Sequence, residues 1–296
     1  MIAASFSVAY LILSWLLIGI RTEQLVLITI FSSLYLGSIP TRKFIIGFSI
    51  FIIFWIIFDY MKAFPNYLYQ EVHIKSLYDA ERYLFGVKHG DATITPNEYL
   101  KFRSVAFVDI LAGIFYLCWI PVPLGFAAFL YFKNREEFLK FSLAFLWVNL
   151  LGFVVYYLYP AAPPWYVELF GFDFKTGTTG HTAGLIRFDE FVGLPIFQGL
   201  YAKSSNVFAA MPSLHSAYPL IVTYYGIKNK LGWVNVIFVI ITLGIWISAV
   251  YTSHHYVLDV LAGIATASIG IWLFNAGLLK NKTIKKFLDR YHEVIS

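Results

Sequence analysis

The segment TSHHYVLD, residues Thr252–Asp259, decides how the fold is interpreted, because it lies between two long apolar runs of the sequence. A short polar segment in that position marks a turn of the chain at a membrane surface. If Asp259 lies in the first turns of a helix, His255 precedes it by four residues, and residues four apart share one helix face. The spacing therefore predicts a carboxylate close enough to orient an imidazole ring.

A second histidine, His215, occurs in AMPSLHSAYP, residues Ala210–Pro219, where another apolar run begins. Pro212 suits the first position of a helix, where its missing N–H costs nothing. The backbone N–H groups of Ser213 and Leu214 would then be free to bind an anion. From the first turn of that helix, His215 could protonate a leaving oxygen.

The same argument applies to His255, because Thr252 or Ser253 can cap the following helix and place His255 in its first turn. A single histidine at a membrane boundary is usually only an interfacial polar residue. Ionisable groups at membrane depth are costly, however, and tend to be functional. Two histidines and a carboxylate at one membrane face therefore favour a phosphate pocket at the level of the lipid headgroups.

The composition indicates an integral membrane protein. Of the 296 residues, 59% are hydrophobic and only 13% are charged, whereas a soluble globular domain carries about 25% charged residues. The formal net charge of +5 does not favour a nucleic-acid partner, because so few charges cannot form an extended phosphate-binding surface. Basic cytoplasmic loops explain the excess more simply.

Apolar runs of about 20 residues cross a bilayer core, and this length predicts an all-α polytopic fold with about eight transmembrane helices. The first two spans are expected to be accessory helices within residues 1–43, and the other six to form the core over residues 44–280. Pro121 and Pro123 predict a kink in the fourth span. Long outer connections are expected at 59–104 and 159–210, and a basic cytoplasmic tail at 281–296. The eight spans cover about residues 2–20, 25–39, 44–58, 105–132, 138–158, 212–227, 232–250 and 255–279.

The basic residues predict the orientation of the chain. With both termini in the cytoplasm, most basic loop residues lie there too, and Arg21 is the only positive charge in the short outer loops. Both long connections, His215 and TSHHYVLD then lie on the non-cytoplasmic face. Short tails and a composition rich in Ile, Phe and Lys favour a bacterial inner membrane over a Golgi membrane.

Two motifs resemble the type 2 phosphatidic acid phosphatase superfamily, whose second and third signatures have the forms PSGH and SRxxxxxHxxxD. They are PSLH at Pro212–His215 and HYVLD at His255–Asp259. Over residues 67–263 the chain more narrowly resembles the aureobasidin-sensitive inositol phosphorylceramide synthases. The stretches that carry this second resemblance are EVHIKSLYDAERYLFG (71–86), YPAAPPWY (159–166), AGLIRFDE (183–190), AMPSLHSAYP (210–219) and TSHHY (252–256).

The resemblance implies a phosphatase-like catalytic core and a role for each site residue. His255 would attack phosphorus and form a phosphohistidine, while Asp259 would hold its ring in the reactive tautomer. His215 would protonate the departing alkoxide and then deprotonate the incoming acceptor. His254 lacks the four-residue spacing to Asp259 and is interpreted as a pocket or interface residue.

The chain departs from the superfamily where positive charge is expected. The Ser-Arg pair falls at Ser248 and Ala249, and the lysine and the Arg-Pro of the first signature fall at Gly152 and Tyr159–Pro160. A phosphoryl-transfer site needs positive charge where negative charge develops. A phosphodiester carries one negative charge and a phosphomonoester up to two, so fewer cations favour a diester substrate.

Arg187, with Lys203, is the candidate for the remaining positive charge, although Arg187 could equally pair with Asp189 or Glu190 in an ordinary loop. The candidate substrate-binding residues are thus Arg187, Lys203, His254 and Ser213. No metal site is expected, because the histidines lack carboxylates or cysteines at ligand spacing. No nucleotide site is expected either, since no Gly-Lys-Ser/Thr follows the glycine-rich segment at 177–184.

The leading hypothesis is a lipid phosphotransferase similar to the inositol phosphorylceramide synthases. It would move phosphoinositol, or a related phospho-headgroup, from a phosphatidylinositol-like glycerophospholipid to a ceramide and release diacylglycerol. Exchange of one phosphodiester for another is nearly balanced in energy, so no cofactor is expected. The first alternative is a lipid phosphate phosphatase of the same superfamily with water as acceptor, and a third possibility is a non-catalytic transporter or scaffold with this fold.

Overall fold

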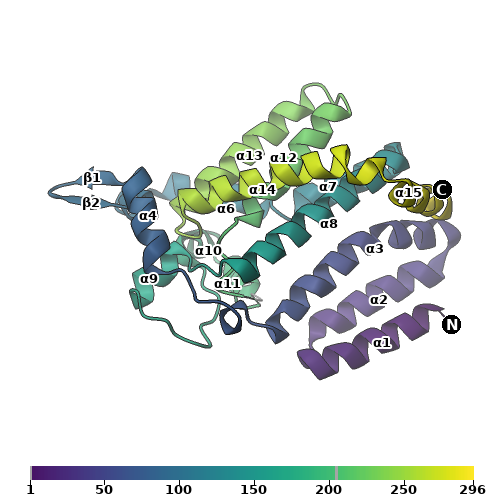
Figure 1. Cartoon of the computed structure of the whole chain (residues 1–296), viewed down its shortest axis with the longest axis horizontal. Coiled ribbons are helices and arrows are strands. Elements are labelled where there is room, and N and C mark those ends of the chain that lie inside the picture. The colour runs from purple at the N-terminus through teal and green to yellow at the C-terminus, as the bar shows by residue number, and fades with distance from the viewer. Residues whose placement is uncertain (1, 204–205) are drawn as a thin grey trace.

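A computed structural model describes residues 2–203 and 206–296, and these form a bundle of helices with one short β-hairpin (Figure 1). In the hairpin, β1 (Val87–His89) pairs antiparallel with β2 (Ala92–Ile94). The α-helices of the described residues are α1 (Ile2–Leu17), α2 (Thr22–Gly37), α3 (Ile39–Tyr60), α4 (Lys75–Phe85), α5 (Pro96–Lys101), α6 (Ala106–Leu117), α7 (Pro121–Lys133), α8 (Arg135–Leu158), α9 (Pro164–Phe170), α10 (Ile186–Val192), α11 (Ile196–Tyr201), α12 (Leu214–Lys228), α13 (Val234–Tyr251), α14 (Val257–Ala276) and α15 (Lys282–Ile295). Short 3-10 helices are η1 (Met61–Ala63), η2 (Asn66–Leu68), η3 (Ala183–Leu185) and η4 (Leu278–Lys280).

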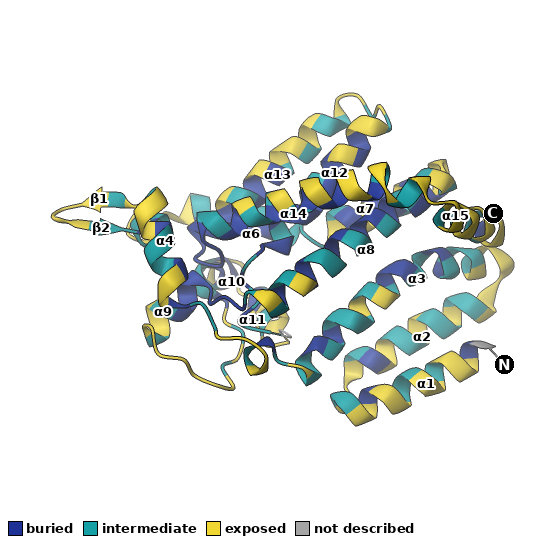
Figure 2. Cartoon of the chain, viewed as in Figure 1, coloured by how far each residue is buried: buried dark blue, intermediate teal, exposed yellow. Residues whose placement is uncertain are grey.

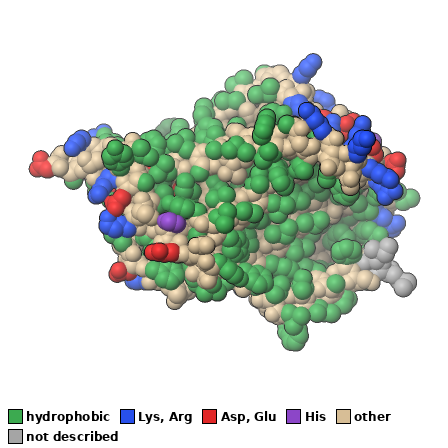
Figure 3. All heavy atoms as spheres, viewed as in Figure 1, with side chains coloured by type: hydrophobic (Ala, Val, Ile, Leu, Met, Phe, Trp, Pro, Cys, Tyr) green, Lys and Arg blue, Asp and Glu red, His purple; other side chains and the backbone are tan. Residues whose placement is uncertain are grey.

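Each of the eight expected spans corresponds to an apolar helix or helix pair. By length and composition, α3, α8, α13 and α14, the first and last extended by η1 and η4, could each cross a membrane alone, and α6 with α7 could do so together. The helices α1 and α2 are shorter apolar helices, and α12 has 15 residues. Hydrophobic side chains cover the middle of the molecule, and charged side chains gather towards its two ends (Figure 3). The all-α membrane fold is therefore confirmed.

The kink expected in the fourth span is present. The helices α6 and α7 are bent by 41° at the break between them. Pro121 is the first residue of α7, a position where the missing N–H of proline costs no hydrogen bond but where the preceding helix cannot continue. The prolines therefore divide this span into two helices.

The start of α3 differs from the expected loop at residues 41–43. The Ser38 side chain accepts a hydrogen bond from the Thr41 N–H, and Pro40 occupies the first turn. These are strong signals for a helix start, so Arg42 and Lys43 lie inside α3. The expected boundary at residue 43 therefore falls within the helix that begins at Ile39.

The core is built around α8, α12 and α14, which pack against one another. The helix α12 also contacts α13 and α7, α3 packs on α8, and the hairpin of α1 and α2 adds to the outer side of α3 (Figure 1). Buried residues face the centre of the bundle, and exposed ones lie on its outer faces (Figure 2). Many of the exposed residues are large and apolar, such as Trp15, Ile247 and Trp272, which suits helices that face lipid and not water.

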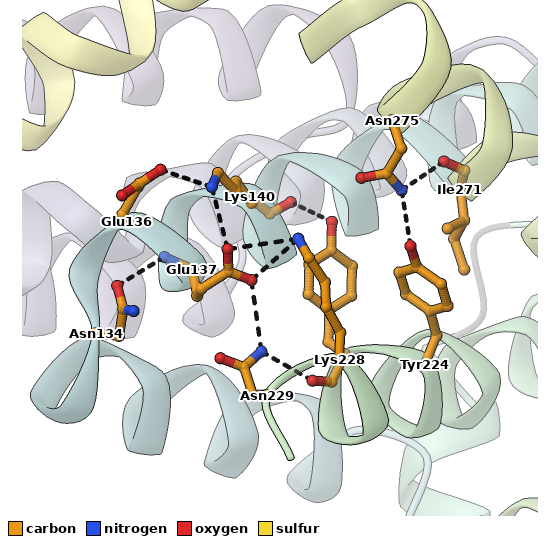
Figure 4. A network of polar contacts seen from close by, with 10 residues as sticks. Asn134, Glu136, Glu137, Lys140, Tyr224, Lys228, Asn229, Ile271 and Asn275 are labelled. Carbon is orange, nitrogen blue, oxygen red and sulfur yellow. Dashed lines mark hydrogen bonds and ion pairs between the residues drawn. The ribbon is translucent and has the colours of Figure 1, made fainter. Parts of the chain in front are cut away.

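A polar network joins α8, α12 and α14 at the end of the bundle away from the histidines (Figure 4). The Glu137 carboxylate lies 3.1 Å from the Lys140 Nζ and 3.1 Å from the Lys228 Nζ. Asn275 in α14 donates to the Tyr224 hydroxyl in α12 at 3.3 Å. The network neutralises two lysines and fixes the far ends of three core helices.

The tail also packs on this end of the molecule. The helix α15 lies against α3 and α8, and the Tyr291 hydroxyl donates to the Ile46 carbonyl at 2.6 Å. Ile295 is buried, whereas Lys285 and Lys286 are exposed. The tail is thus a helix with an exposed basic side, docked onto the bundle.

The two long connections fold together at the opposite end. The first contains η1, η2, α4, the β-hairpin and α5, and the second contains α9, η3, α10 and α11. Isolated parallel bridges join His73 to Ala161 and Ala161 to Ala209. The first connection, the proline-rich turn after α8 and the segment that leads into α12 therefore lie side by side.

Candidate active site

Residues 252–256 connect α13 to α14 in a tight turn, which we call the histidine turn. The backbone N–H groups of His254 and His255 both donate to the Ala249 carbonyl, at 3.1 and 3.0 Å. The helix α14 begins only at Val257, and Tyr256 is its N-cap residue. The expectation that Thr252 or Ser253 caps this helix with His255 in its first turn is therefore wrong, because the carbonyl of Ala249 holds the segment in a turn.

Asp259 lies at the third position of α14, and its carboxylate accepts the Tyr256 N–H at 2.8 Å. The oxygen that accepts this N–H also faces the imidazole: Asp259 Oδ2 lies 3.5 Å from His255 Nδ1. Asp259 and His255 are close to each other, as the sequence predicts. They do not share a helix face, however, because His255 lies in the turn before α14. Asp259 is fully buried and His255 is 6% exposed.

The start of α12 brings His215 to the same place. His215 Nδ1 lies 3.3 Å from His255 Nε2, so the three side chains form a chain from carboxylate to imidazole to imidazole. The Tyr116 hydroxyl of α6 lies 2.9 Å from the same His215 nitrogen, and the Trp119 ring packs against the His215 ring with centroids 4.5 Å apart. His215 is thus held by two aromatic side chains as well as by its own helix.

Burial determines the charge of the His255 ring, which lies between Asp259 and His215. Removal from water disfavours a charged imidazole and lowers the pKa of His255 to about 4. The ring is therefore neutral at neutral pH. With Asp259 beside Nδ1, a proton on that nitrogen leaves a lone pair on Nε2, the atom that lies 3.3 Å from His215 Nδ1.

Ser213 does not have the role expected of it. Its side chain caps α12 by accepting the Ser216 N–H at 3.3 Å, and its own N–H donates to the Asp259 carbonyl at 2.9 Å. This N–H is therefore not free to bind an anion, and the side chain is fully buried. A Cβ on Gly263 would lie 2.1 Å from the Ser213 carbonyl, so only glycine lets α14 approach the start of α12 this closely.

A cavity of about 560 Å³ opens beside the histidines. His215, His254 and His255 form part of its wall together with Tyr201 and Lys203. Elsewhere the wall is mainly apolar and comes largely from α2, α3 and α7. These residues include Leu27, Ile30, Leu34, Phe44, Phe48, Phe51, Phe54, Trp55, Phe58 and Leu124.

The cavity runs along the bundle and not only at its end. Phe44 and Phe58 both line it and are 14 residues apart in α3. At a rise of 1.5 Å per residue this corresponds to about 21 Å along the helix. The histidines therefore lie at the polar end of a long apolar groove between the N-terminal hairpin and the core.

Two of the expected substrate-binding residues reach this cavity. Lys203 lines it and lies 2.6 Å from Glu23 Oε1 of α2. Among the lining residues that the structure describes, Lys203 is the only lysine or arginine. His254 also lines the cavity, but its Nε2 donates to the Thr182 carbonyl at 2.8 Å, and its ring stacks on Tyr201.

Arg187 does not line the cavity. Its Nε donates to Asp109 Oδ1 at 2.6 Å, and its guanidinium lies over the Tyr251 ring. The alternative pairing with Asp189 or Glu190 is also not formed by the described residues, because the Asp189 carboxylate accepts backbone N–H groups at the start of α11. Arg187 is thus neutralised by a carboxylate of α6 that the sequence did not single out.

The positions where the superfamily signatures carry cations are closely packed here. A Cβ on Gly152 would lie 2.7 Å from Leu214 Cδ2, so α8 and α12 touch where a lysine would otherwise project. Ala249 is fully buried against an apolar cluster that includes Leu185 and Phe188. Close packing of the helices therefore fills the positions of the two missing cations, and no positively charged side chain of the described residues lies at either position.

Several residues of the site were not found by sequence reasoning. Tyr116 and Trp119 lie in a long apolar run, where nothing distinguishes them from the other aromatic residues. Glu81 and Asn97 contact the histidine turn from the first outer connection, as described below. Within residues 2–203 and 206–296, no group of three or more His, Cys, Asp or Glu side chains is arranged to hold a metal ion.

Three known proteins are similar to this chain over 97%, 85% and 68% of its length. A phosphoinositol dihydroceramide synthase from Bacteroides thetaiotaomicron is 44% identical over 97% of this chain and 94% of that protein. An inositol phosphorylceramide synthase from Candida albicans is 28% identical over 85% of this chain, and the catalytic subunit of that synthase from Saccharomyces cerevisiae is 30% identical over 68%. The chain spans 52% and 49% of these two fungal relatives. No solved structure matches the chain.

A family model agrees with the motifs and the geometry. The model of the PAP2 superfamily matches residues 91–273, a range that includes α6 to α13, the histidine turn and most of α14. It contains His215, His255 and Asp259, the three side chains that the fold brings together. On the motifs, the arrangement of the site and this match, the chain belongs to the PAP2 superfamily.

Proposed function

We propose that the protein transfers phosphoinositol from a phosphatidylinositol-like glycerophospholipid to a ceramide or dihydroceramide and releases diacylglycerol. The observation that carries this proposal is the chain of Asp259, His255 and His215 at the polar end of a long apolar cavity. The similarity to the phosphoinositol dihydroceramide synthase over nearly the full length of both chains supports the choice of headgroup and acceptor.

The first half-reaction would use His255 as the nucleophile. Its Nε2 lone pair attacks the phosphorus of the donor, a bond from nitrogen to phosphorus forms, and the bond from phosphorus to the diacylglycerol oxygen breaks. Asp259 holds the Nδ1 proton and stabilises the positive charge that develops on the ring. His215, which touches His255 Nε2, donates a proton to the departing oxygen and leaves neutral diacylglycerol.

The second half-reaction reverses these roles. His215 takes the proton of the ceramide hydroxyl, the hydroxyl oxygen attacks the phosphohistidine, and the bond between His255 and phosphorus breaks. One phosphodiester replaces another, and both histidines return to their starting states. No net proton is consumed, and no nucleotide is required.

The charge of the site suits a phosphodiester. Gly152 and Ala249 leave no room for the superfamily cations, and Lys203 is the only lysine or arginine on the described cavity wall. A diester brings one negative charge and a terminal phosphate up to two, and an uncompensated charge in a buried site is costly. This comparison favours the transferase over a phosphatase acting on a phosphomonoester.

The apolar part of the cavity suits lipid chains. We assign the donor and acceptor chains to the groove between α2, α3 and α7, with the headgroup beside Lys203. The N-terminal hairpin then acts as an accessory unit that closes one side of the groove, and residues 44–280 form the catalytic core. The site would face the non-cytoplasmic side of a bacterial inner membrane, which fits the basic residues of the short loops and the tail at the opposite end of the bundle.

The proposal is tested by supplying purified protein with phosphatidylinositol that carries a labelled inositol ring, together with ceramide. Labelled phosphoceramide should form with the wild-type protein and not with His255→Asn. Labelled inositol phosphate released to water would identify a hydrolase instead. Absence of both products from the wild-type protein would contradict the proposal.

A further inference from the structure

The first outer connection contacts the histidine turn through two buried polar side chains. Glu81 in α4 and Asn97 in α5 are both fully buried. Both Glu81 oxygens are used: Oε1 accepts the Val257 N–H at 2.9 Å, and Oε2 accepts the Leu258 N–H at 3.0 Å. These two N–H groups belong to the first turn of α14, the helix that carries Asp259.

Asn97 holds the other side of the same turn. Its Nδ2 donates to the Val250 carbonyl at the end of α13 and to the His255 carbonyl, each at 2.8 Å. The amide thus joins the end of one helix to the backbone of the reacting histidine. Buried amides and carboxylates are costly unless they are hydrogen-bonded, so their presence here fixes the backbone in one arrangement.

Together with Asp259, Glu81 completes the cap of α14. The Tyr256 N–H goes to Asp259, and the next two N–H groups go to Glu81. A carboxylate at a helix N-terminus is favoured by the partial positive charge of the helix end. Because Glu81 fixes where α14 starts, it also fixes the distance of Asp259 from the His255 ring.

We infer that Glu81 and Asn97 are positioning residues for the phosphoryl-transfer step, and that the first outer connection serves to hold the histidine turn in place. The expected changes in kcat rest on the proposed function. The expected changes in amide hydrogen exchange at the histidine turn rest on the structure alone. Glu81 and Asn97 do not line the cavity, so they act through His255 and Asp259 and not on the lipid.

The experiment compares Glu81→Ala and Glu81→Gln with Asp79→Asn, a matched control. Asp79 lies on the same helix, but it pairs with Lys75 and Arg82 at the surface and not with α14. A displacement of about 1 Å at a reacting group costs on the order of 100-fold in rate. We expect Glu81→Ala to lower kcat by about that factor with KM for both lipids unchanged. Glu81→Gln keeps one acceptor oxygen, so its kcat should lie between those of Glu81→Ala and the wild type. The kcat of Asp79→Asn should equal that of the wild type.

A second pair of variants tests Asn97. Asn97→Ala removes two bonds to backbone carbonyls, and Asn66→Ala removes two bonds of the same kind, from Asn66 Nδ2 to the Tyr156 and Phe208 carbonyls. Both variants should lose thermal stability, but only Asn97→Ala should lower kcat per folded molecule. An equal loss of kcat in both would mean that the effect is only structural, and would overturn the role of Asn97.

Amide hydrogen exchange separates this inference from the proposed function. Exchange at residues 252–260 should increase in Glu81→Ala and Asn97→Ala and stay at the wild-type rate in Asp79→Asn, whichever lipids the protein accepts. If the wild-type protein is inactive on phosphatidylinositol and ceramide but exchange changes as expected, the proposed function fails, whereas the positioning of the turn by Glu81 and Asn97 is supported. Unchanged exchange, or an unchanged kcat of Glu81→Ala in an active protein, would overturn the inference.

Discussion

His215 Nδ1 lies 3.3 Å from His255 Nε2, although the two residues are 40 positions apart and belong to different helix boundaries. The contact places a proton donor and acceptor directly beside the atom that would attack phosphorus. It arises because Gly263 lets α14 approach the start of α12 and because Ser213 donates its N–H to the Asp259 carbonyl.

The Tyr116 hydroxyl holds His215 in the orientation that meets His255. Tyr116→Phe removes this hydrogen bond and leaves the ring in place. A neutral hydrogen bond contributes about 1 kcal/mol, and the loss should lower kcat by roughly fivefold with little change in KM. Tyr225→Phe is the matched control, since its hydroxyl donates to the Lys140 carbonyl at the other end of the bundle. Equal turnover in the two variants would contradict this role of Tyr116.

The groove between α2 and α3 should be needed for lipid chains. Leu27 lines the cavity, whereas its neighbour Val26 is exposed on the outer side of the same helix. Leu27→Trp should raise KM for long-chain ceramide more than for a short-chain analogue, because the larger ring occupies the groove. Val26→Trp should leave both values at the wild-type level. The same KM change for both chain lengths would place the lipid chains elsewhere.

A cation cannot be restored at the position of the first superfamily signature. Gly152→Ala places a methyl group against Leu214 and should destabilise the protein by about 1–3 kcal/mol, as overpacking in a core does. Gly125→Ala is the control, because nothing lies within 4 Å of a Cβ at that helical glycine. Its thermal midpoint should stay the same or rise. A Gly152→Ala protein as stable as the wild type would contradict the close packing of α8 and α12.

The buried histidine turn predicts an acid-sensitive fold. The pKa of His255 falls from 6.5 to about 4 because burial disfavours its charged form, and burial lowers the pKa of His254 as well. Between pH 6.5 and about pH 4 the unfolded chain binds a proton on His255 that the folded chain does not. The free energy of unfolding is therefore highest above about pH 6.5 and decreases as the pH falls towards 4. Thermal unfolding measured across this range should show the decrease, and His255→Asn should make it shallower. An equal slope in the variant would show that His255 is not buried in its neutral form.

The sequence predicts most of the fold, because hydrophobic runs of membrane length and two short motifs are strong local signals. The eight apolar units, the kink at Pro121 and the meeting of His215, His255 and Asp259 all follow from them. Helix starts are less predictable, because capping depends on contacts made after folding. The Ser213 N–H is taken by the Asp259 carbonyl, and the histidine turn is closed by the Ala249 carbonyl.

Charge pairing between distant segments is the part that the sequence could not provide. Arg187 pairs with Asp109, 78 residues away, and Lys203 pairs with Glu23 in the N-terminal hairpin. Glu81 and Asn97 reach the active site from the first outer connection, where no sequence pattern distinguishes them from the other polar residues. Only the folded arrangement of the two outer connections selects among them.

In the proposed reaction, His255 carries the phosphoinositol group between donor and acceptor. This role of His255 can be measured by mass spectrometry of the protein after incubation with phosphatidylinositol in the absence of ceramide. We expect a phosphoinositol adduct on the imidazole of His255, and this adduct should disappear when ceramide is added and phosphoceramide forms. Product formation without this adduct, or an adduct on another residue, would contradict this role.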